Sequence, residues 1–371
     1  MRCRFCCYKK ILLAVAVIVC SMSPVNVFAE EKSPEITVEY GELRNLLKTG
    51  NPTLKQVFDE YGDELSAYQE MWDVMKFQQG NLEDKAEEAK DEGEENAAVY
   101  ASNAQLLKTA AGRIYKSMEN MKTEKSTRSM ENSADSYTLT AQTVMNSYNQ
   151  MSENVEVQEK SAEALRAVYA ETVKKLAVGS ATQADAVSAE KNLTKAVNSL
   201  ETLREEEEQL KLSLLTMLGL QGNESVTIGK IPEPDLSEIE AIDLEADKKK
   251  AISNSSEVQE ARHSTAYSTV KMNQRARLSA EAEETAVADI QEAYDTLMVK
   301  KVNYQAALTA FQGSLSDYQS LQRRLQAGML SNVDYINGEA EFMEKKAAKE
   351  IASMNLVQAY ESYCWEAEGI D

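Results

Sequence analysis

Long stretches without helix-breaking residues constrain this chain more than any other feature of its sequence. The chain has five prolines: Pro24, Pro34, Pro52, Pro232 and Pro234. Residues 53–231 and 235–371 therefore contain no proline, and glycine is absent from 113–178 and 230–312. Inside a helix, proline costs about 3 kcal/mol and glycine about 1 kcal/mol relative to alanine. Because these stretches are also rich in Ala, Glu, Lys, Leu and Gln, they predict long helices.

Apolar residues at seven-residue spacing support this prediction. One track carries Leu193, Leu200 and Leu214, with Glu207 as its only interruption, and the neighbouring track carries Ala196, Leu203, Leu210 and Met217. Such a pattern is typical of a coiled-coil seam. A helix over 183–218 would be about 54 Å long at ~1.5 Å per residue, which is too long for the core of a compact domain. Strand signals are scarce, and ESVTIG at 224–229 is the best candidate. We therefore expect an all-α fold of long antiparallel coiled-coil hairpins with little or no β structure.

One short pattern occurs twice, 149 residues apart. KKLAVGSATQADAVSAE spans 174–190, and RRLQAGMLSNVDYINGE spans 323–339. Both place a glycine three residues after a leucine, then Thr or Ser three residues later, then Asp three residues further on. The shared residues are Leu176, Gly179, Thr182 and Asp185 in the first copy and Leu325, Gly328, Ser331 and Asp334 in the second.

Each shared residue has a role in a tight reversal between two helices. The glycine suits the left-handed residue that follows a helix, since it has no Cβ. Thr182 or Ser331 suits the N-cap of the next helix, and Asp185 or Asp334 can complete a capping box. Two such turns predict a tandem duplication of a helical hairpin. We place the first repeat at 30–230, a linker at 231–247 and the second repeat at 248–371.

The first 29 residues predict a secretory signal peptide. A basic segment precedes the apolar run ILLAVAVIVC at 11–20, and VFA ends at Ala29 as a cleavage site. Cys20 leaves lipidation open as an alternative. Removing residues 1–29 removes four basic residues and no acidic one, which takes the net charge from −21 to −25. A surface with this charge repels nucleic acid and anionic lipid headgroups.

The sequence offers no catalytic or metal-binding pattern. The single histidine, His263, lies in a polar stretch with no Cys, Asp or Glu at ligand spacing. There is no glycine-rich phosphate loop, and GLQG at 219–222 is better interpreted as a helix end. We therefore expect a protein that is not an enzyme and that binds no cofactor.

At the repeated turns the sequence resembles the TolC-like outer-membrane efflux protein family. In that family each half of a duplicated chain has a long helical hairpin that ends in a glycine-containing turn followed by Ser or Thr and then Asp. The segment 36–57 is similar to the opening of the family, with Asn51-Pro52 at the familiar place. The segment 242–261 resembles a second, degenerate copy of this opening, and LLTMLGL at 214–220 resembles the helix end that closes the first half.

This resemblance implies a TolC-like helical barrel subunit, a homotrimer that forms the duct of an efflux or type I secretion system. Its hairpin tips would dock an adaptor, or membrane fusion, protein. The residues placed at the adaptor-facing end are Gly179, Thr182, Asp185, Gly328, Met329, Leu330, Ser331 and Asp334. Met329 and Leu330 are apolar residues in a turn, where solvent alone would not favour them.

The sequence departs from the family where members that span an outer membrane carry paired amphipathic strands. No alternating segments of about ten residues occur at those places. The first half has the acidic segment DKAEEAKDEGEE, and 275–290 in the second half predicts a helix. We expect an exported protein of the cell envelope. A location in the outer membrane is implied only by the resemblance to the family. The alternative function is an exported coiled-coil scaffold or interaction protein without transport activity.

Overall fold

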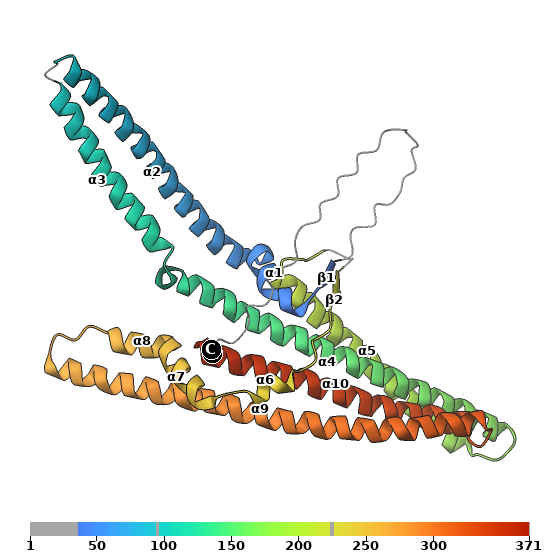
Figure 1. The fold of residues 1–371 in the computed structure, drawn as a ribbon. Coiled ribbons are helices and arrows are strands. Elements are labelled where there is room, and N and C mark those ends of the chain that lie inside the picture. The colour runs from blue at the N-terminus through green and yellow to red at the C-terminus, as the bar shows by residue number, and fades with distance from the viewer. Residues whose placement is uncertain (1–35, 94–95, 223–225, 371) are drawn as a thin grey trace, which may run out of the picture. The chain divides into compact units, whose positions relative to one another are not determined.

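Long helices make up most of the protein. The computed structural model describes residues 36–370, apart from 94–95 and 223–225. The long helices, shown in Figure 1, are α2 (Pro52–Asp91), α3 (Ala97–Met121), α4 (Glu124–Ala177), α5 (Gln183–Met217), α9 (Thr269–Gln326) and α10 (Asn332–Glu368). The short helices are α1 (Leu43–Gly50), α6 (Leu236–Glu240), α7 (Leu244–Asn254) and α8 (Ser256–His263). The prediction of an all-α fold with long helical hairpins is therefore confirmed.

Three pairs of long helices pack along their lengths as hairpins: α2 with α3, α4 with α5, and α9 with α10. Helix α10 also packs extensively against α4, which joins the two parts of the chain. Helix α5, Gln183–Met217, agrees closely with the helix expected over 183–218. The segment 275–290, expected to be helical, lies inside α9. The predicted signal peptide, 1–29, lies outside the described residues, and the repeat boundaries stay a prediction.

A small parallel sheet connects two distant segments. Strand β1 (Ile36–Val38) pairs with β2 (Val226–Ile228), with Thr37 opposite Thr227. Strand β2 lies within the segment 224–229 that the sequence favoured as a strand. Strand β1 was not expected from the sequence, because three residues paired with a segment 190 positions away leave no local signal.

Side-chain hydrogen bonds place several helix breaks where the sequence has neither glycine nor proline. Within the stretch 113–178, which lacks both residues, α3 ends at Met121 and α4 begins at Glu124. Here Thr123 Oγ1 donates to the carbonyl of Asn120 at 2.7 Å, and Ser126 Oγ donates to the same carbonyl at 2.8 Å. Hydroxyl groups that bond nearby carbonyls compete with the helix for them. Within 235–312, which also lacks both residues, α7, α8 and α9 begin at the N-caps Asp243, Ser255 and Ser268.

The two hairpins α4–α5 and α9–α10 start from similar junctions, which we call the roots. In the first root, Asn51 caps the start of α2, and its Nδ2 donates to the carbonyl of Met217 at 2.8 Å. In the second root, Asn254 Nδ2 donates to the carbonyl of Ala367 at 3.3 Å. A glycine with positive φ follows each hairpin, Gly219 and Gly369. A Cβ on Gly219 would lie 1.9 Å from the carbonyl oxygen of Gly50. The roots therefore hold two backbones too close for any side chain.

Each root adjoins a hydrophobic core. The first core gathers Leu43, Leu47, Leu54, Met145, Leu214 and Leu218 with residues of both strands. The second core gathers Ile239, Ala251, Ile290, Leu297, Leu356 and Tyr363. Burying one such side chain contributes roughly 1.5–3 kcal/mol. The apolar cores thus lie beside the roots, whereas most seam residues of α5, such as Leu200 and Leu203, are only half-buried.

The contact between α4 and α10 is polar along much of its length, and we call it the polar seam. Asn146 donates from Nδ2 to Gln358 Oε1, and Gln358 Nε2 lies 3.3 Å from Thr143 Oγ1. Trp365 Nε1 donates to Gln142 Oε1 at 3.0 Å. The Oδ1 atom of Asn146 is buried without a hydrogen-bond partner. Asn146 and Gln142 are almost fully buried, so hydrogen-bond geometry adds to the apolar contact of Val357 with the first core in fixing this seam.

Candidate partner-binding tips

The turns between α4 and α5 and between α9 and α10, which we call the tips, have the same backbone structure. The N–H groups of Gly179 and Ser180 donate to the carbonyls of Leu176 and Lys175, at 3.0 and 2.7 Å. In the second tip, the N–H groups of Gly328 and Met329 donate to the carbonyls of Leu325 and Arg324, both at 2.9 Å. This bonding pattern is the Schellman motif, which satisfies the last carbonyls of a helix. The expected left-handed glycines are confirmed, with φ of 75° at Gly179 and 69° at Gly328.

The next helix is capped by the predicted residue in both tips. Thr182 Oγ1 accepts from the N–H of Asp185 at 3.2 Å, and Asp185 Oδ2 accepts from the N–H of Thr182 at 2.8 Å. This is a complete capping box, and the N–H of Thr182 lowers the pKa of Asp185. In the second tip, Ser331 Oγ accepts from the N–H of Asp334 at 3.1 Å and donates to Asp334 Oδ2 at 2.7 Å. The sequence therefore identified the structural role of these residues, while their role in partner binding stays a prediction.

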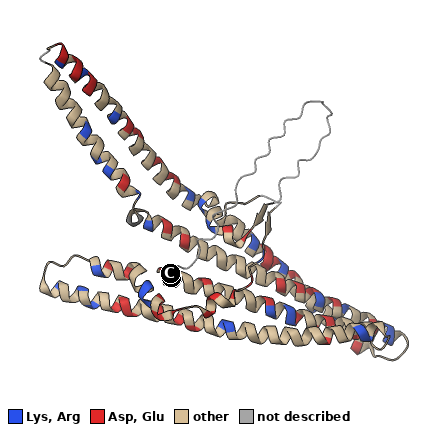
Figure 2. Ribbon diagram, in the orientation of Figure 1, with Lys and Arg blue, Asp and Glu red and all other residues tan. Residues whose placement is uncertain are grey.

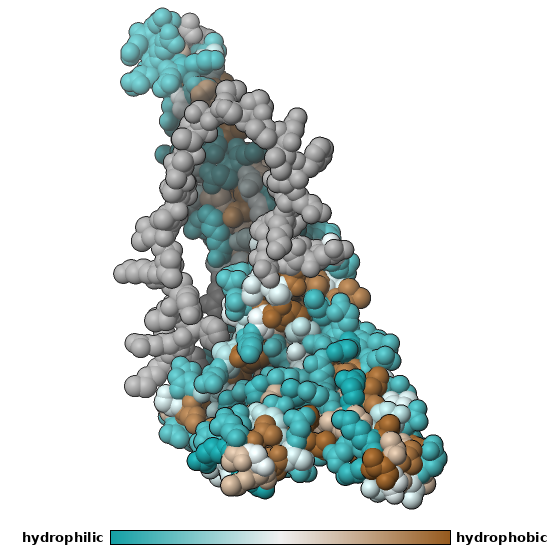
Figure 3. All heavy atoms as spheres, turned by 90° about the vertical axis from the view of Figure 1, so that its right-hand side faces the viewer, coloured by the Kyte–Doolittle hydropathy of each residue, from teal (hydrophilic) through white to brown (hydrophobic). Residues whose placement is uncertain are grey.

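Each tip exposes a large apolar side chain, at a different place in the turn. Met329, which follows the second glycine, is 74% exposed, while its neighbour Leu330 is half-buried. In the first tip the exposed residue is Val178, 77% exposed, which precedes the glycine. Sequence reasoning missed Val178, although a valine at a helix end beside a glycine is a signal of the same kind as Met329. Figure 3 views the face that carries the tips and shows hydrophobic residues among hydrophilic ones.

An aromatic cluster supports the second tip. The rings of Tyr318 and Phe342 stack with centroids 4.4 Å apart, and the hydroxyls of Tyr318 and Tyr335 lie 2.9 Å apart. Tyr318 Oη also donates to Glu339 at 2.9 Å, and the other carboxylate oxygen of Glu339 lies 3.5 Å from Nζ of Lys160 on α4. The positions 149 residues before Tyr335 and Phe342 are Ala186 and Leu193. The two tips therefore share a turn but differ in what lies beneath it.

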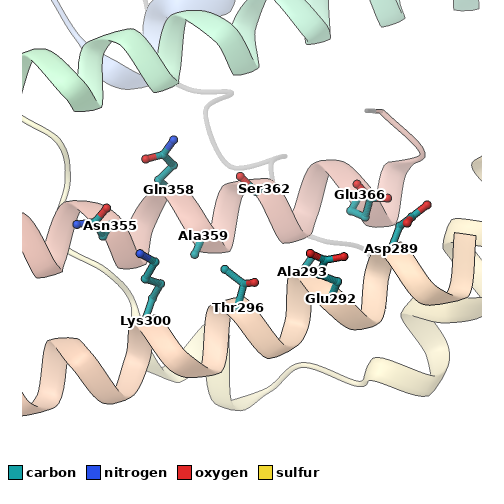
Figure 4. Close-up of a pocket in the computed structure, with 10 residues that line it drawn as sticks. All are labelled: Asp289, Glu292, Ala293, Thr296, Lys300, Asn355, Gln358, Ala359, Ser362 and Glu366. Carbon is teal, nitrogen blue, oxygen red and sulfur yellow. The ribbon is translucent and has the colours of Figure 1, made fainter.

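A second candidate site is a groove of about 520 Å³ between α9 and α10, shown in Figure 4. Helix α9 contributes Asp289, Glu292, Ala293, Thr296 and Lys300, and α10 contributes Asn355, Gln358, Ala359, Ser362 and Glu366. The groove is open and is lined by carboxylates and a lysine. In the described part of the chain, no group of three or more His, Cys, Asp or Glu side chains could hold a metal ion. His263 is exposed at the end of α8. This groove carries no functional assignment.

Known proteins resemble this chain in structure and not in sequence. No family model matches the chain, and no curated protein matches it. The solved structure of CusC, described as forming a transmembrane channel, matches with a TM-score of 0.50 and 11% identity, over 91% of this chain and 97% of CusC. A membrane protein from Pseudomonas aeruginosa matches with a TM-score of 0.49 and 12% identity over 94% of this chain and 97% of that protein. The outer membrane protein VceC from Vibrio cholerae matches with a TM-score of 0.46 and 10% identity, over 89% of this chain and 96% of VceC.

The chain has a TolC-like fold. The likeness to CusC extends over nearly all of both chains, so the resemblance that the repeated turns indicated is confirmed at the level of the fold. Among the described helices, none combines the length and the apolar composition that crossing a bilayer requires.

Proposed function

We propose that the protein is an exported component of an efflux or type I secretion system in the cell envelope. In this proposal its α4–α5 and α9–α10 hairpins form part of a helical duct, and its tips dock the helical hairpin of an adaptor protein. The TolC-like fold supports the duct, since channel proteins share it. The observation that carries the docking is the pair of tips, which repeat one turn and each expose a large apolar residue, Val178 and Met329.

Turn formation alone does not account for these exposed residues. The backbone bonds of the tips involve the glycines, the N-caps and the last carbonyls, and none of them needs an apolar side chain at 178 or 329. Exposed apolar residues at such places are typical of interaction sites. The charged residues just before the glycines, Lys175 and Arg324 among them, would surround this apolar contact with a polar rim.

The duct further requires a homo-oligomer, which we propose to be a trimer. Large apolar side chains are exposed along the hairpins, including Leu212 on α5 and Val299 and Val302 on α9. One hairpin layer cannot bury both of its sides, so neighbouring copies would cover these residues. Sedimentation of the purified mature protein at micromolar concentration should give a trimer. A monomer under these conditions contradicts the duct.

The docking is tested with the purified helical hairpin of each adaptor protein encoded in the same genome, immobilised for binding measurements. The wild-type protein should bind one of them, and Met329→Glu with Leu330→Glu should weaken that binding at least tenfold, as expected when an apolar contact of about 1.4 kcal/mol or more is lost. Val178→Glu should have an effect in the same direction. The melting temperature should change little, because these substitutions leave both N-caps intact.

The matched control is Val99→Glu with Leu106→Glu, which charges two comparably exposed apolar residues on α3. This control should bind the adaptor hairpin like the wild type. If the tip variants bind as well as the wild type, or if no adaptor hairpin binds at all, the docking proposal fails. An exported structural scaffold would then be the better interpretation.

A further inference from the structure

The turn that joins α8 to α9 is unusually apolar for an exposed segment. Four large side chains around it are exposed: Tyr267 by 86%, Val270 by 76%, Met272 by 52% and Leu278 by 47%. No other large apolar side chain in the described part of the chain is as exposed as Tyr267. Single exposed apolar residues are ordinary, but four within twelve positions form a patch that indicates a binding partner.

The same segment is basic in an acidic protein. Residues 261–280 contain Arg262, Lys271, Arg275 and Arg277 and no acidic residue. Arg262 pairs with Glu283 at 3.0 Å, and Arg275 Nη1 donates to the carbonyl of Ser264 at 3.3 Å. Lys271 and Arg277 are exposed. The net charge of the whole chain is therefore a poor guide to this end of α9, where an anionic partner is favoured.

The apolar side chains do not lie on one face of the helix. Residues two positions apart, such as Val270 and Met272, point in nearly opposite directions on a helix, and Leu278 points in a third. A protein partner covers one side of a helix end, whereas a lipid interface surrounds an inserted end on all sides. Tyrosine is favoured at the membrane interface, and long Lys and Arg side chains can keep their charges at the headgroups while their stems lie in apolar surroundings.

The acidic turn between α2 and α3 of a second copy is the competing anionic partner. Its exposed acidic residues, which Figure 2 shows gathered at that turn, are Glu83, Asp84, Glu87, Glu88, Asp91 and Glu92. Between Phe77 and Val99, however, the described residues include no exposed large apolar side chain. This turn could pair with Lys271 and Arg277 but offers nothing to cover Tyr267, so the observations favour lipid.

We propose that the α8–α9 turn docks on an anionic lipid bilayer. Tyr267, Val270 and Met272 enter the headgroup region, and Lys271 and Arg277 contact the lipid phosphates. The nearest acidic residue after the patch, Glu281, lies about 15 Å along the helix from Lys271 at ~1.5 Å per residue. Glu281 lies only about 6 Å along the helix from Arg277, within the screening length of about 8 Å at physiological salt, so it weakens the attraction at Arg277 but little at Lys271.

The test is co-sedimentation of the purified mature protein with vesicles of phosphatidylglycerol and phosphatidylethanolamine, compared with vesicles of phosphatidylcholine alone. Binding to the anionic vesicles should be at least tenfold tighter and should weaken as salt is raised. Lys271→Gln with Arg277→Gln should lose roughly tenfold or more, as expected for two basic residues near an anionic surface. Tyr267→Ser with Val270→Ser should also lose binding, because less apolar surface is buried.

Two matched controls separate the patch from general effects of charge and hydrophobicity. Lys191→Gln with Lys195→Gln removes two exposed positive charges from α5, and Val99→Ser with Leu106→Ser removes two exposed apolar residues from α3. Both should bind vesicles like the wild type, and all variants should keep their helical content and melting temperature. All α8–α9 variants should still bind the adaptor hairpin, so this proposal and the proposed function can fail separately.

The proposal is overturned if the wild-type protein does not bind the anionic vesicles, or if the controls lose as much binding as the patch variants. Self-association that disappears in the patch variants, without vesicle binding, would instead assign the turn to the acidic α2–α3 turn of a second copy.

Discussion

At both ends of the α4–α5 and α9–α10 hairpins, a helix is followed by a glycine with positive φ, but the surroundings of that glycine differ. At the roots, Gly219 and Gly369 press against the backbones of Gly50 and Asn254. At the tips, a Cβ on Gly179 or Gly328 would meet no atom within 4 Å. The same conformation therefore serves close packing at the roots and only the reversal of the chain at the tips.

The largest effect expected from this comparison is a difference between two glycine substitutions. Gly219→Ala combines the strain of a left-handed residue with an overlap against Gly50, and should destabilise the protein by roughly 2–5 kcal/mol. Gly179→Ala incurs the strain alone and should cost about 1–2 kcal/mol. Urea unfolding followed by circular dichroism measures both. Equal costs would mean that the roots are as open as the tips.

The second prediction compares the carboxyl groups of a root and a tip. Glu361, two helical turns before Gly369, faces Gln142 of α4, Glu238 of α6 and Tyr40, and burial raises its pKa to about 7. Because its folded pKa lies above the ordinary value of 4.5, the stability it contributes is present below pH 4.5 and is lost as pH rises through 7. The loss should be about 3 kcal/mol between pH 4.5 and 8. In Glu361→Gln this part of the pH dependence should disappear from urea unfolding curves.

The carboxyl group of Asp185 should show the opposite sign. Its pKa is lowered by the N–H of Thr182, so the stability it contributes is present above its ordinary pKa and is lost as pH falls through the folded pKa. Stability that changes with pH in the same direction at both sites would contradict the contrast between root and tip.

The smallest effects are expected at the N-caps of the tips. Thr182→Ala and Ser331→Ala should each cost about 1 kcal/mol, because each removes the acceptor for one N–H at the start of a helix. Asp185→Ala should destabilise more than Asp334→Ala, since Asp185 also accepts from the backbone N–H of Thr182. Thermal unfolding of the four variants compares them. A larger cost at Asp334 would show that the reciprocal bond at Asp185 adds nothing.

The repeated turns were the most predictable part of the molecule. Their glycines, N-caps and acidic residues act through local hydrogen bonds, which depend on residues only a few positions apart. The breaks of the long helices were less predictable. The break at Thr123 and the caps at Ser255 and Ser268 use hydroxyl groups, which also occur freely inside these helices, for example at Thr143.

Features that depend on distant partners could not be foreseen. Strand β1 exists because β2 lies beside it, and the close approach of Gly50 and Gly219 requires the end of α5 to meet the end of α1. The apolar and basic patch at Tyr267 was readable in the sequence, but its exposure was not. In the candidate site, Met329 lies between the glycine and the N-cap, where an apolar residue stands out in the sequence, whereas Val178 lies at the end of a helix, where apolar residues are common.

The polar seam has a mechanical consequence. Apolar helix faces can slide past one another while keeping most of their buried area, but amide pairs such as Asn146 with Gln358 match at one axial position only. A slip of α10 along α4 by one helical turn, about 5.4 Å, would separate these partners and leave their polar atoms buried without hydrogen bonds. The seam therefore fixes the axial register of α10 on α4, and with it the position of one hairpin along the other.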